Sequence, residues 1–156
     1  MMNQPAILIV GAGSIGERHI RNLWSLGYKN ILVFRQRNLP FRDIADANVT
    51  VVLDWQEALN KKPLAASICT PTAQHLQQTI DCINTNIHVL VEKPLAHENF
   101  DASNIIELAN QQNVLVQVAY MMRYHPLLQQ VKTAAEQKKY GNLVNIQTFW
   151  GEDLIA

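Results

Sequence analysis

The chain has 156 residues, of which 48% are hydrophobic, and its 13 basic side chains balance 13 acidic ones. This length suits one well-packed domain and is too short for two of ordinary size. A net charge of zero, with no basic arm or acidic tail, argues against a general nucleic-acid or anionic-membrane surface, because both depend on electrostatic attraction.

The cysteines and the N-terminal residues bear on the compartment. Cys69 and Cys82 form neither a disulfide framework nor a metal-ligand spacing, so we expect no metal site and a reducing compartment. The first apolar run is too short for a signal peptide or a membrane span, and no basic region precedes it. These features predict a cytoplasmic protein without a membrane or nucleic-acid partner.

The first predicted element is a strand over residues 6–10, AILIV, followed by a glycine-rich turn. The strand is apolar at every position, which is typical of a parallel strand buried on both faces. Gly11, Gly13 and Gly16 follow at the spacing G-x-G-x-x-G and open a helix, whose free N–H groups favour an anion. This context predicts a dinucleotide site, in which the second glycine lets a pyrophosphate approach the backbone. A purely structural turn is the alternative.

The helix after the glycines has an amphipathic pattern. It carries Ile20, Leu23 and Trp24 on one face, with Glu17 elsewhere. We expect the helix to end at Gly27, which is typical of a C-terminal cap.

The second predicted strand, residues 30–34, ends in Arg35, Gln36 and Arg37. About 20 residues past the glycines, a fold that prefers NAD normally places an acidic residue that accepts from the ribose 2′-hydroxyl. Two guanidinium groups suit a 2′-phosphate instead, so the sequence favours NADP over NAD, with Arg35 or Arg37 as the phosphate clamp. A solvated pair of loop arginines is the alternative.

The following residues alternate between strands and helices. We expect a short helix over 39–47, strands over 48–53, 64–69, 87–91 and 114–118, and helices over 54–59, 73–84 and 98–110. Asp54 can cap the helix over 54–59, and the helix over 98–110 has Ala102, Ile105, Ile106 and Ala109 facing inward. This alternation predicts right-handed crossovers and an α/β fold with a doubly wound, mostly parallel six-stranded Rossmann sheet. Ligands of such sheets bind beyond the carboxyl ends of the strands.

The tail changes character. A polar and aromatic connection over 120–126 leads to a predicted helix over 127–138 and a predicted strand over 143–150. A strand after a completed sheet has no partner within the chain. We therefore expect a dinucleotide-binding domain over 1–120 and, over 121–156, a connecting helix and the first strand of an incomplete α+β domain. Exposed apolar residues there would favour self-association, so a homo-oligomer is possible.

Together these residues resemble the Gfo/Idh/MocA family of NAD(P)-dependent oxidoreductases, which pair a Rossmann domain with a larger α+β substrate domain. The resemblance rests on four stretches in order: GAGSIG at 11–16, CTPTAQH at 69–75, EKP at 92–94 and MMRYHP at 121–126. It covers nearly the whole chain, but about the first half of the family's catalytic unit.

The resemblance implies a set of site residues. The pyrophosphate would be held by Gly11, Gly13, Ser14, Ile15 and Gly16, and the nicotinamide half of the cleft would be lined by Thr70, Pro71, His75, Glu92 and Lys93. It also implies that the Lys93-Pro94 bond is often cis.

Lys93 is the expected catalytic residue. Its ammonium would polarise the reacting oxygen and share in proton transfer, with Glu92 orienting it. The alternative for Lys93 is a surface lysine in a turn. His75 is as consistent with a structural role as with a ligand contact, and His19 is expected on the helix surface or in packing.

The family implies hydride transfer between a nicotinamide cofactor and a sugar, cyclitol or similar polyol derivative. Its further proton-transferring Asp and His lie in a substrate-domain helix that this chain does not contain. We therefore expect cofactor binding without turnover by this chain alone. A non-catalytic NAD(P)-sensing or interaction module is the alternative, and a methyltransferase ranks below both because it would not use EKP.

Overall fold

A computed structural model describes residues 4–45, 48–97, 101–149 and 151 of the chain. It divides into two compact units, residues 1–119 and 120–156. Each unit is considered by itself.

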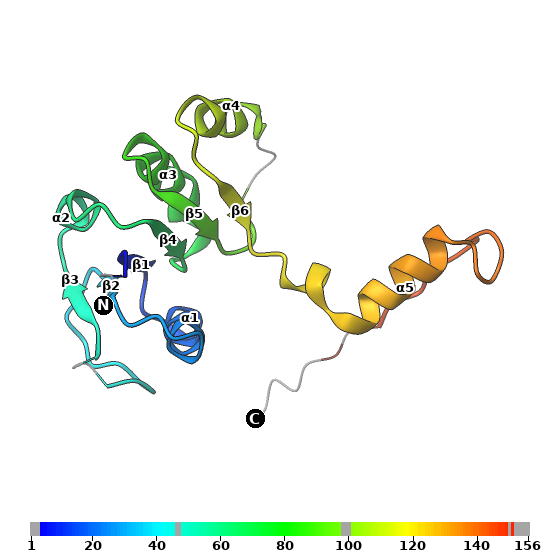
Figure 1. Cartoon of the computed structure of the whole chain (residues 1–156), viewed down its shortest axis with the longest axis horizontal. Coiled ribbons are helices and arrows are strands. Elements are labelled where there is room, and N and C mark those ends of the chain that lie inside the picture. The colour runs from blue at the N-terminus through cyan, green and yellow to red at the C-terminus, as the bar shows by residue number, and fades with distance from the viewer. Residues whose placement is uncertain (1–3, 46–47, 98–100, 150, 152–156) are drawn as a thin grey trace. The chain divides into compact units, whose positions relative to one another are not determined.

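The first unit is built around one sheet of six parallel strands in the order β3-β2-β1-β4-β5-β6 (Figure 1). The strands are β1 (Ile7–Val10), β2 (Ile31–Phe34), β3 (Thr50–Val52), β4 (Ala65–Ile68), β5 (His88–Val91) and β6 (Val116–Val118). The helices are α1 (Ser14–Ser25), α2 (Trp55–Asn60), α3 (Thr72–Asn84) and α4 (Ser103–Gln111). The predicted doubly wound α/β sheet is confirmed.

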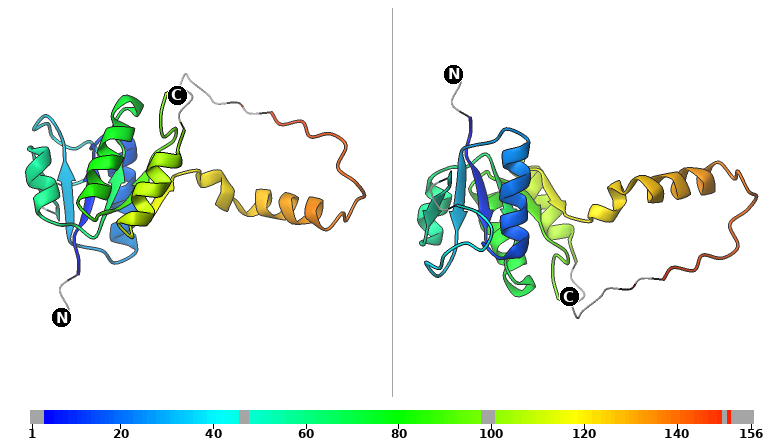
Figure 2. Two further views of the ribbon diagram at one scale, coloured as in Figure 1. Left: turned by 90° about the horizontal axis from the view of Figure 1, so that it is seen from above. Right: turned by 90° about the horizontal axis from the view of Figure 1, so that it is seen from below.

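The alternation of side chains along the strands divides the core between the two faces of the sheet. Ile9 and Val33 pack on the face that α1 covers, together with Ile20 of that helix. Leu8 and Val10 point to the other face, where α2 and α3 pack. Figure 2 shows α1 and α3 on opposite sides of the sheet. Because both faces are covered, β1 and β2 are apolar at every position.

The register aligns the carboxyl ends of the central strands. Val10 lies opposite Phe34 and Ile68, and Ile68 lies opposite Val91. The residues that follow these strands therefore start at one edge of the sheet. They are Gly11, Arg35, Cys69 and Glu92.

Two helix ends form as the sequence predicts. Gly27 has a φ of +86° and its N–H donates to the Trp24 carbonyl, while the N–H of Tyr28 donates to the Leu23 carbonyl. These two bonds are the glycine-dependent C-terminal cap. At the start of α2, Asp54 accepts from the N–H of Glu57 at 2.7 Å.

Two predicted elements of the first unit differ from the structure. Residues 39–45 contain no helix, since Pro40 and scattered polar residues provide no continuous apolar face; 46–47 lie outside the described residues. Helix α4 begins at Ser103, with Ala102 as its N-cap, and the Asp101 carboxylate before it accepts from the Ser103 N–H at 2.9 Å. Residues 98–100 are not described. Ile106, expected in the core, is 60% exposed.

The second unit contains a short 3-10 helix, η2 (Met121–Tyr124), and α5 (Pro126–Glu136). Pro126 occupies the first helical position, where its missing N–H costs nothing. The predicted strand over 143–150 is wrong for residues 143–149, which form no regular structure, and Trp150 lies outside the described residues. The physical reason is the absence of a partner strand within the described part of this unit.

Candidate functional site

The turn after β1 is shaped by its glycines. Gly11 has a φ of +93°, and a Cβ there would lie 3.1 Å from the Cys69 backbone. A Cβ on Gly16 would overlap the carbonyl oxygen of Gly11, so the helix and the turn pack too closely for any side chain. At Gly13, by contrast, a Cβ would meet nothing within 4 Å. Gly11 and Gly16 therefore allow the close packing of the turn, while Gly13 leaves open space beside the backbone.

The start of α1 borders this open space. The helix begins at Ser14 with Gly13 as its N-cap, and no side chain caps it. The N–H groups at the start of a helix have no partners within the helix, and the dipole makes this end electropositive. Ser14 and Ile15 are exposed here, whereas Gly16 is buried. This arrangement suits the phosphates of a nucleotide.

A cleft of about 510 Å³ runs from the glycine turn across the ends of β2 and β4. Its lining comes from four segments: Gly11–Gly13 with Glu17, Phe34–Arg37, the loop residues Leu39, Pro40 and Arg42, and Cys69–Pro71 with Gln74. Six predicted cofactor residues thus lie together here: Gly11, Gly13, Arg35, Arg37, Thr70 and Pro71. Arg42 lines the same cleft and was not predicted.

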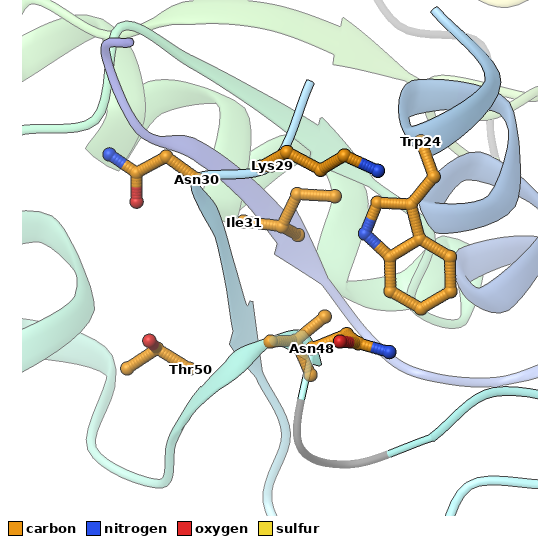
Figure 3. Close-up of a pocket in the computed structure, with 7 residues that line it drawn as sticks. Trp24, Lys29, Asn30, Ile31, Asn48 and Thr50 are labelled. Atoms are coloured by element: carbon orange, nitrogen blue, oxygen red, sulfur yellow. The ribbon is translucent and has the colours of Figure 1, made fainter. Parts of the chain in front are cut away.

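A second cavity of the same volume lies at the opposite edge of the sheet, where β2 and β3 begin (Figure 3). Trp24, Lys29, Asn30 and Thr50 are among its lining residues. Ligands of doubly wound sheets bind at the carboxyl ends of the strands, and this cavity lies at the amino ends. The first cleft is therefore the candidate site.

Arg35 is held as part of the cleft wall. Its side chain is 8% exposed, and its guanidinium carbon lies 4.2 Å from the centre of the Phe41 ring. One terminal nitrogen donates to Asn38 at 3.2 Å, and the buried Nε has no hydrogen-bond partner. Arg37 is exposed. The cleft thus contains a fixed cation and an exposed one, which suits an anionic ligand group.

Glu17 differs most from the sequence interpretation. It was placed off the apolar face of α1, yet it is 1% exposed, and its carboxylate accepts from the N–H groups of Arg42 at 2.9 Å and Asp43 at 2.8 Å. Two charge-assisted hydrogen bonds compensate for burial of the charge. The available signal was its spacing, three residues before Ile20 and seven before Trp24.

His75 joins two segments at the other end of the site. It is 2% exposed, with Nε2 at 2.7 Å from the Thr70 carbonyl oxygen and Nδ1 at 2.8 Å from the Pro94 carbonyl oxygen. A neutral imidazole donates through one nitrogen, and the protonated ring donates through both. Both ring nitrogens therefore face backbone groups, so His75 shapes the site through the turn at Thr70 and the loop at Pro94.

Glu92 and Lys93 follow β5. Glu92 Oε1 lies 3.2 Å from His19 Nε2 on α1, and the N–H of Lys93 lies 3.4 Å from the other oxygen. Glu92 thus contacts the Lys93 backbone. Its partner His19 is partly buried, and of the two roles that the sequence left open, helix surface or packing, this contact favours packing. The Lys93 side chain is exposed and makes no ion pair with any residue in the described ranges. The Lys93-Pro94 bond is cis.

Cys69 lies in the cleft wall as a neutral thiol. Burial raises its pKa to about 12; the Ser67 hydroxyl opposes this increase, and the charge of Glu92 adds to it. The thiol therefore places no negative charge beside an anionic ligand at neutral pH.

Among the described residues, no group of three or more His, Cys, Asp and Glu side chains could hold a metal ion. Within the same ranges, no helix is long and apolar enough to cross a membrane.

Comparison with known proteins gives a consistent picture. The model of a family described as an oxidoreductase family with an NAD-binding Rossmann fold, GFO_IDH_MocA, matches residues 6–120. An uncharacterised oxidoreductase, YrbE, of Bacillus subtilis is 26% identical over 145 residues, which cover 90% of this chain and 42% of the relative. The inositol 2-dehydrogenase of Mycolicibacterium smegmatis is 27% identical over 146 residues, with 90% and 42% covered.

A solved structure shares the fold. The WlbA dehydrogenase of Bordetella pertussis, crystallised with NADH and UDP-GlcNAcA, superposes with a TM-score of 0.77 at 23% identity, over 89% of this chain and 44% of that chain. The chain therefore spans less than half the length of these proteins.

Proposed function

The chain belongs to the Gfo/Idh/MocA oxidoreductase family, and on this premise we propose that its first unit binds NADP in preference to NAD. The observation that carries the proposal is the meeting of the open glycine turn with Arg35 and Arg37 in one cleft. The turn and the start of α1 would hold the pyrophosphate through Gly11, Gly13, Ser14, Ile15 and Gly16. The arginines would hold a 2′-phosphate.

We also propose that the chain is the cofactor-binding half of an enzyme that acts on a sugar, cyclitol or similar polyol. The bound nicotinamide supplies the chemistry of hydride transfer. Lys93 would hold its ammonium against the reacting oxygen and move the proton, while Thr70, Pro71, His75 and Glu92 would shape that end of the site. Relatives that include an inositol 2-dehydrogenase and a UDP-N-acetylglucosamine 3-dehydrogenase support the substrate class.

Turnover would require a second domain. Residues 121–156 would be the connecting helix and the beginning of that domain, and this chain alone would bind cofactor without oxidising a polyol. Location in the cytoplasm is part of the proposal and rests on the two free cysteines, Cys69 and Cys82. The runner-up function, a non-catalytic sensing module, predicts the same binding but no oxidation after the missing half is supplied.

The first experiment is a titration of the purified chain with NADPH and NADH, followed by nicotinamide fluorescence. NADPH should bind more tightly, and Arg37→Ser should weaken it by about tenfold, because a charge-assisted contact is lost. Lys29→Ser is the matched control, since it removes one exposed positive charge at the opposite edge of the sheet and should change neither affinity. Equal binding of the two nucleotides would overturn the NADP preference, and no binding of either would overturn the proposed cofactor role.

A further inference from the structure

The loop between β2 and β3 contains no regular structure over residues 38–45, yet side chains fix it in three places. Arg35 stacks on the Phe41 ring at 4.2 Å. Glu17 accepts from two successive backbone N–H groups of the loop, at positions 42 and 43. Arg21 of α1 also pairs with Asp43 at 3.3 Å, although this pair is exposed. The central contact is therefore the buried one made by Glu17.

The position of Glu17 is unusual for an anion-binding cleft. Glu17 is one of the residues that line the same cleft as the glycine turn, where a negative charge would oppose a phosphate. Each carboxylate oxygen of Glu17 already accepts from the loop backbone, at 2.9 and 2.8 Å, and the side chain is only 1% exposed, so the carboxylate is not presented to a ribose hydroxyl. An acidic residue near the adenosine ribose is the usual mark of NAD specificity, and here the nearby acid is used in another way.

Arg42 is the residue that this contact positions. Its backbone N–H is held by Glu17, and its side chain lines the cleft together with Arg35 and Arg37. The guanidinium is exposed and has no hydrogen-bond or ion-pair partner within the described ranges. The cleft therefore contains three cations from one loop, of which Arg42 comes from a part of the loop that the sequence pattern did not single out.

We propose that Arg42 is a specificity-determining residue for the 2′-phosphate of NADP and that Glu17 is its positioning residue. The inference rests on the proposed function, because it requires a nucleotide in this cleft. A buried carboxylate on the first turn of α1 fixes the loop backbone before ligand arrives, so the Arg42 guanidinium loses less freedom on binding. The start of α1 would then hold the pyrophosphate and, through Glu17, would also position Arg42 for the 2′-phosphate.

The test uses the adenosine half alone, so that the nicotinamide end of the site plays no part. The probes are adenosine 2′,5′-bisphosphate and 5′-AMP, titrated calorimetrically into the chain. Arg42→Ser should weaken the bisphosphate about tenfold and leave 5′-AMP within about twofold, because a charge-assisted contact to one phosphate is lost. Glu17→Gln should weaken the bisphosphate selectively by a smaller factor, since the amide nitrogen cannot accept from the loop.

A double variant separates positioning from general damage. If Glu17 acts through Arg42, adding Glu17→Gln to a chain that already carries Arg42→Ser should reduce the bisphosphate affinity little further. Arg21→Ser is the matched control, since it removes the exposed pair with Asp43 and should change the bisphosphate affinity by less than about twofold. Glu17→Asp keeps the charge and should restore part of the affinity.

The outcomes are distinguishable. An unchanged bisphosphate affinity in Arg42→Ser, beside a loss in Arg37→Ser, would overturn this inference and leave the proposed function standing. Equal binding of both probes to the unsubstituted chain would overturn the NADP preference, and binding of neither would overturn both proposals. If Glu17→Gln fails to fold, Arg42→Ser, whose side chain is exposed, still decides the role of Arg42.

Discussion

The two compact units differ in the burial of their apolar residues. In the first, Leu8, Ile9 and Val10 are 0% exposed. In the second, Val144 is 94% exposed, Phe149 is 92% exposed, and no described residue between 120 and 149 is buried. The predicted strands of both regions are mainly apolar, with all five residues apolar over 6–10 and five of the eight over 143–150. The difference therefore comes from whether a partner is present.

The second unit also contains a contrast of its own. Helix α5 forms although nothing in it is buried, because its hydrogen bonds join residues four apart and Lys132 pairs with Glu136 on one face. Residues 143–149 form no strand, because a strand must find its hydrogen-bond partners in another segment. Local structure survives without tertiary packing, and non-local structure does not.

The most direct way to break the comparison is to remove the same kind of atoms from both units. Ile9→Ala should destabilise the chain by about 3 kcal/mol, because it leaves a cavity between β1 and α1. Val144→Ala should cost less than about 0.5 kcal/mol, since the side chain is already in water. Urea denaturation followed by circular dichroism measures both. A comparable loss from Val144→Ala would mean that residues 143–149 are packed.

A second pair of substitutions compares a closely packed glycine of the turn, Gly16, with an open one, Gly13. Gly16→Ala should cost roughly 2 kcal/mol, since its Cβ would overlap the Gly11 carbonyl and the backbone would have to move. Gly13→Ala should leave stability within about 0.5 kcal/mol, because its Cβ meets nothing within 4 Å and its φ is −80°. Thermal denaturation gives the stabilities, and NADPH titration should show that Gly13→Ala nevertheless loses affinity. If Gly13→Ala binds NADPH with full affinity, the pyrophosphate does not lie against Gly13.

The sequence predicted what depends on short-range pattern. The apolar run at 6–10, the glycine spacing, the cap at Gly27 and the cap at Asp54 each involve neighbours within a few residues. These signals suffice for the order of the elements in the first unit and for the edge at which the candidate site lies.

What the sequence did not predict depends on contacts between distant segments. Glu17 and Arg42 are 25 residues apart, and His19 and Glu92 are 73 residues apart. The spacing of Glu17 from Ile20 and Trp24 puts it near the apolar face, but a charged residue on a helix is most often solvated, so this signal alone does not mark Glu17 as buried beneath a loop. The predicted strand over 143–150 failed for the same reason, because its β-branched and aromatic residues indicate a strand propensity and not a partner strand.

The smallest expected effect comes from helix caps, where the two units differ again. Asp54 caps α2 through its side chain, whereas His125 stands at the start of α5 without a side-chain cap bond. Asp54→Ala should destabilise the first unit by about 1 kcal/mol, because the Glu57 N–H loses its acceptor. His125→Asp should add a cap to α5 and raise helicity measured by circular dichroism, while the urea midpoint of the first unit stays unchanged. A shifted midpoint would mean that α5 contributes to the stability of the first unit, and the contrast between the two regions would then be one of degree.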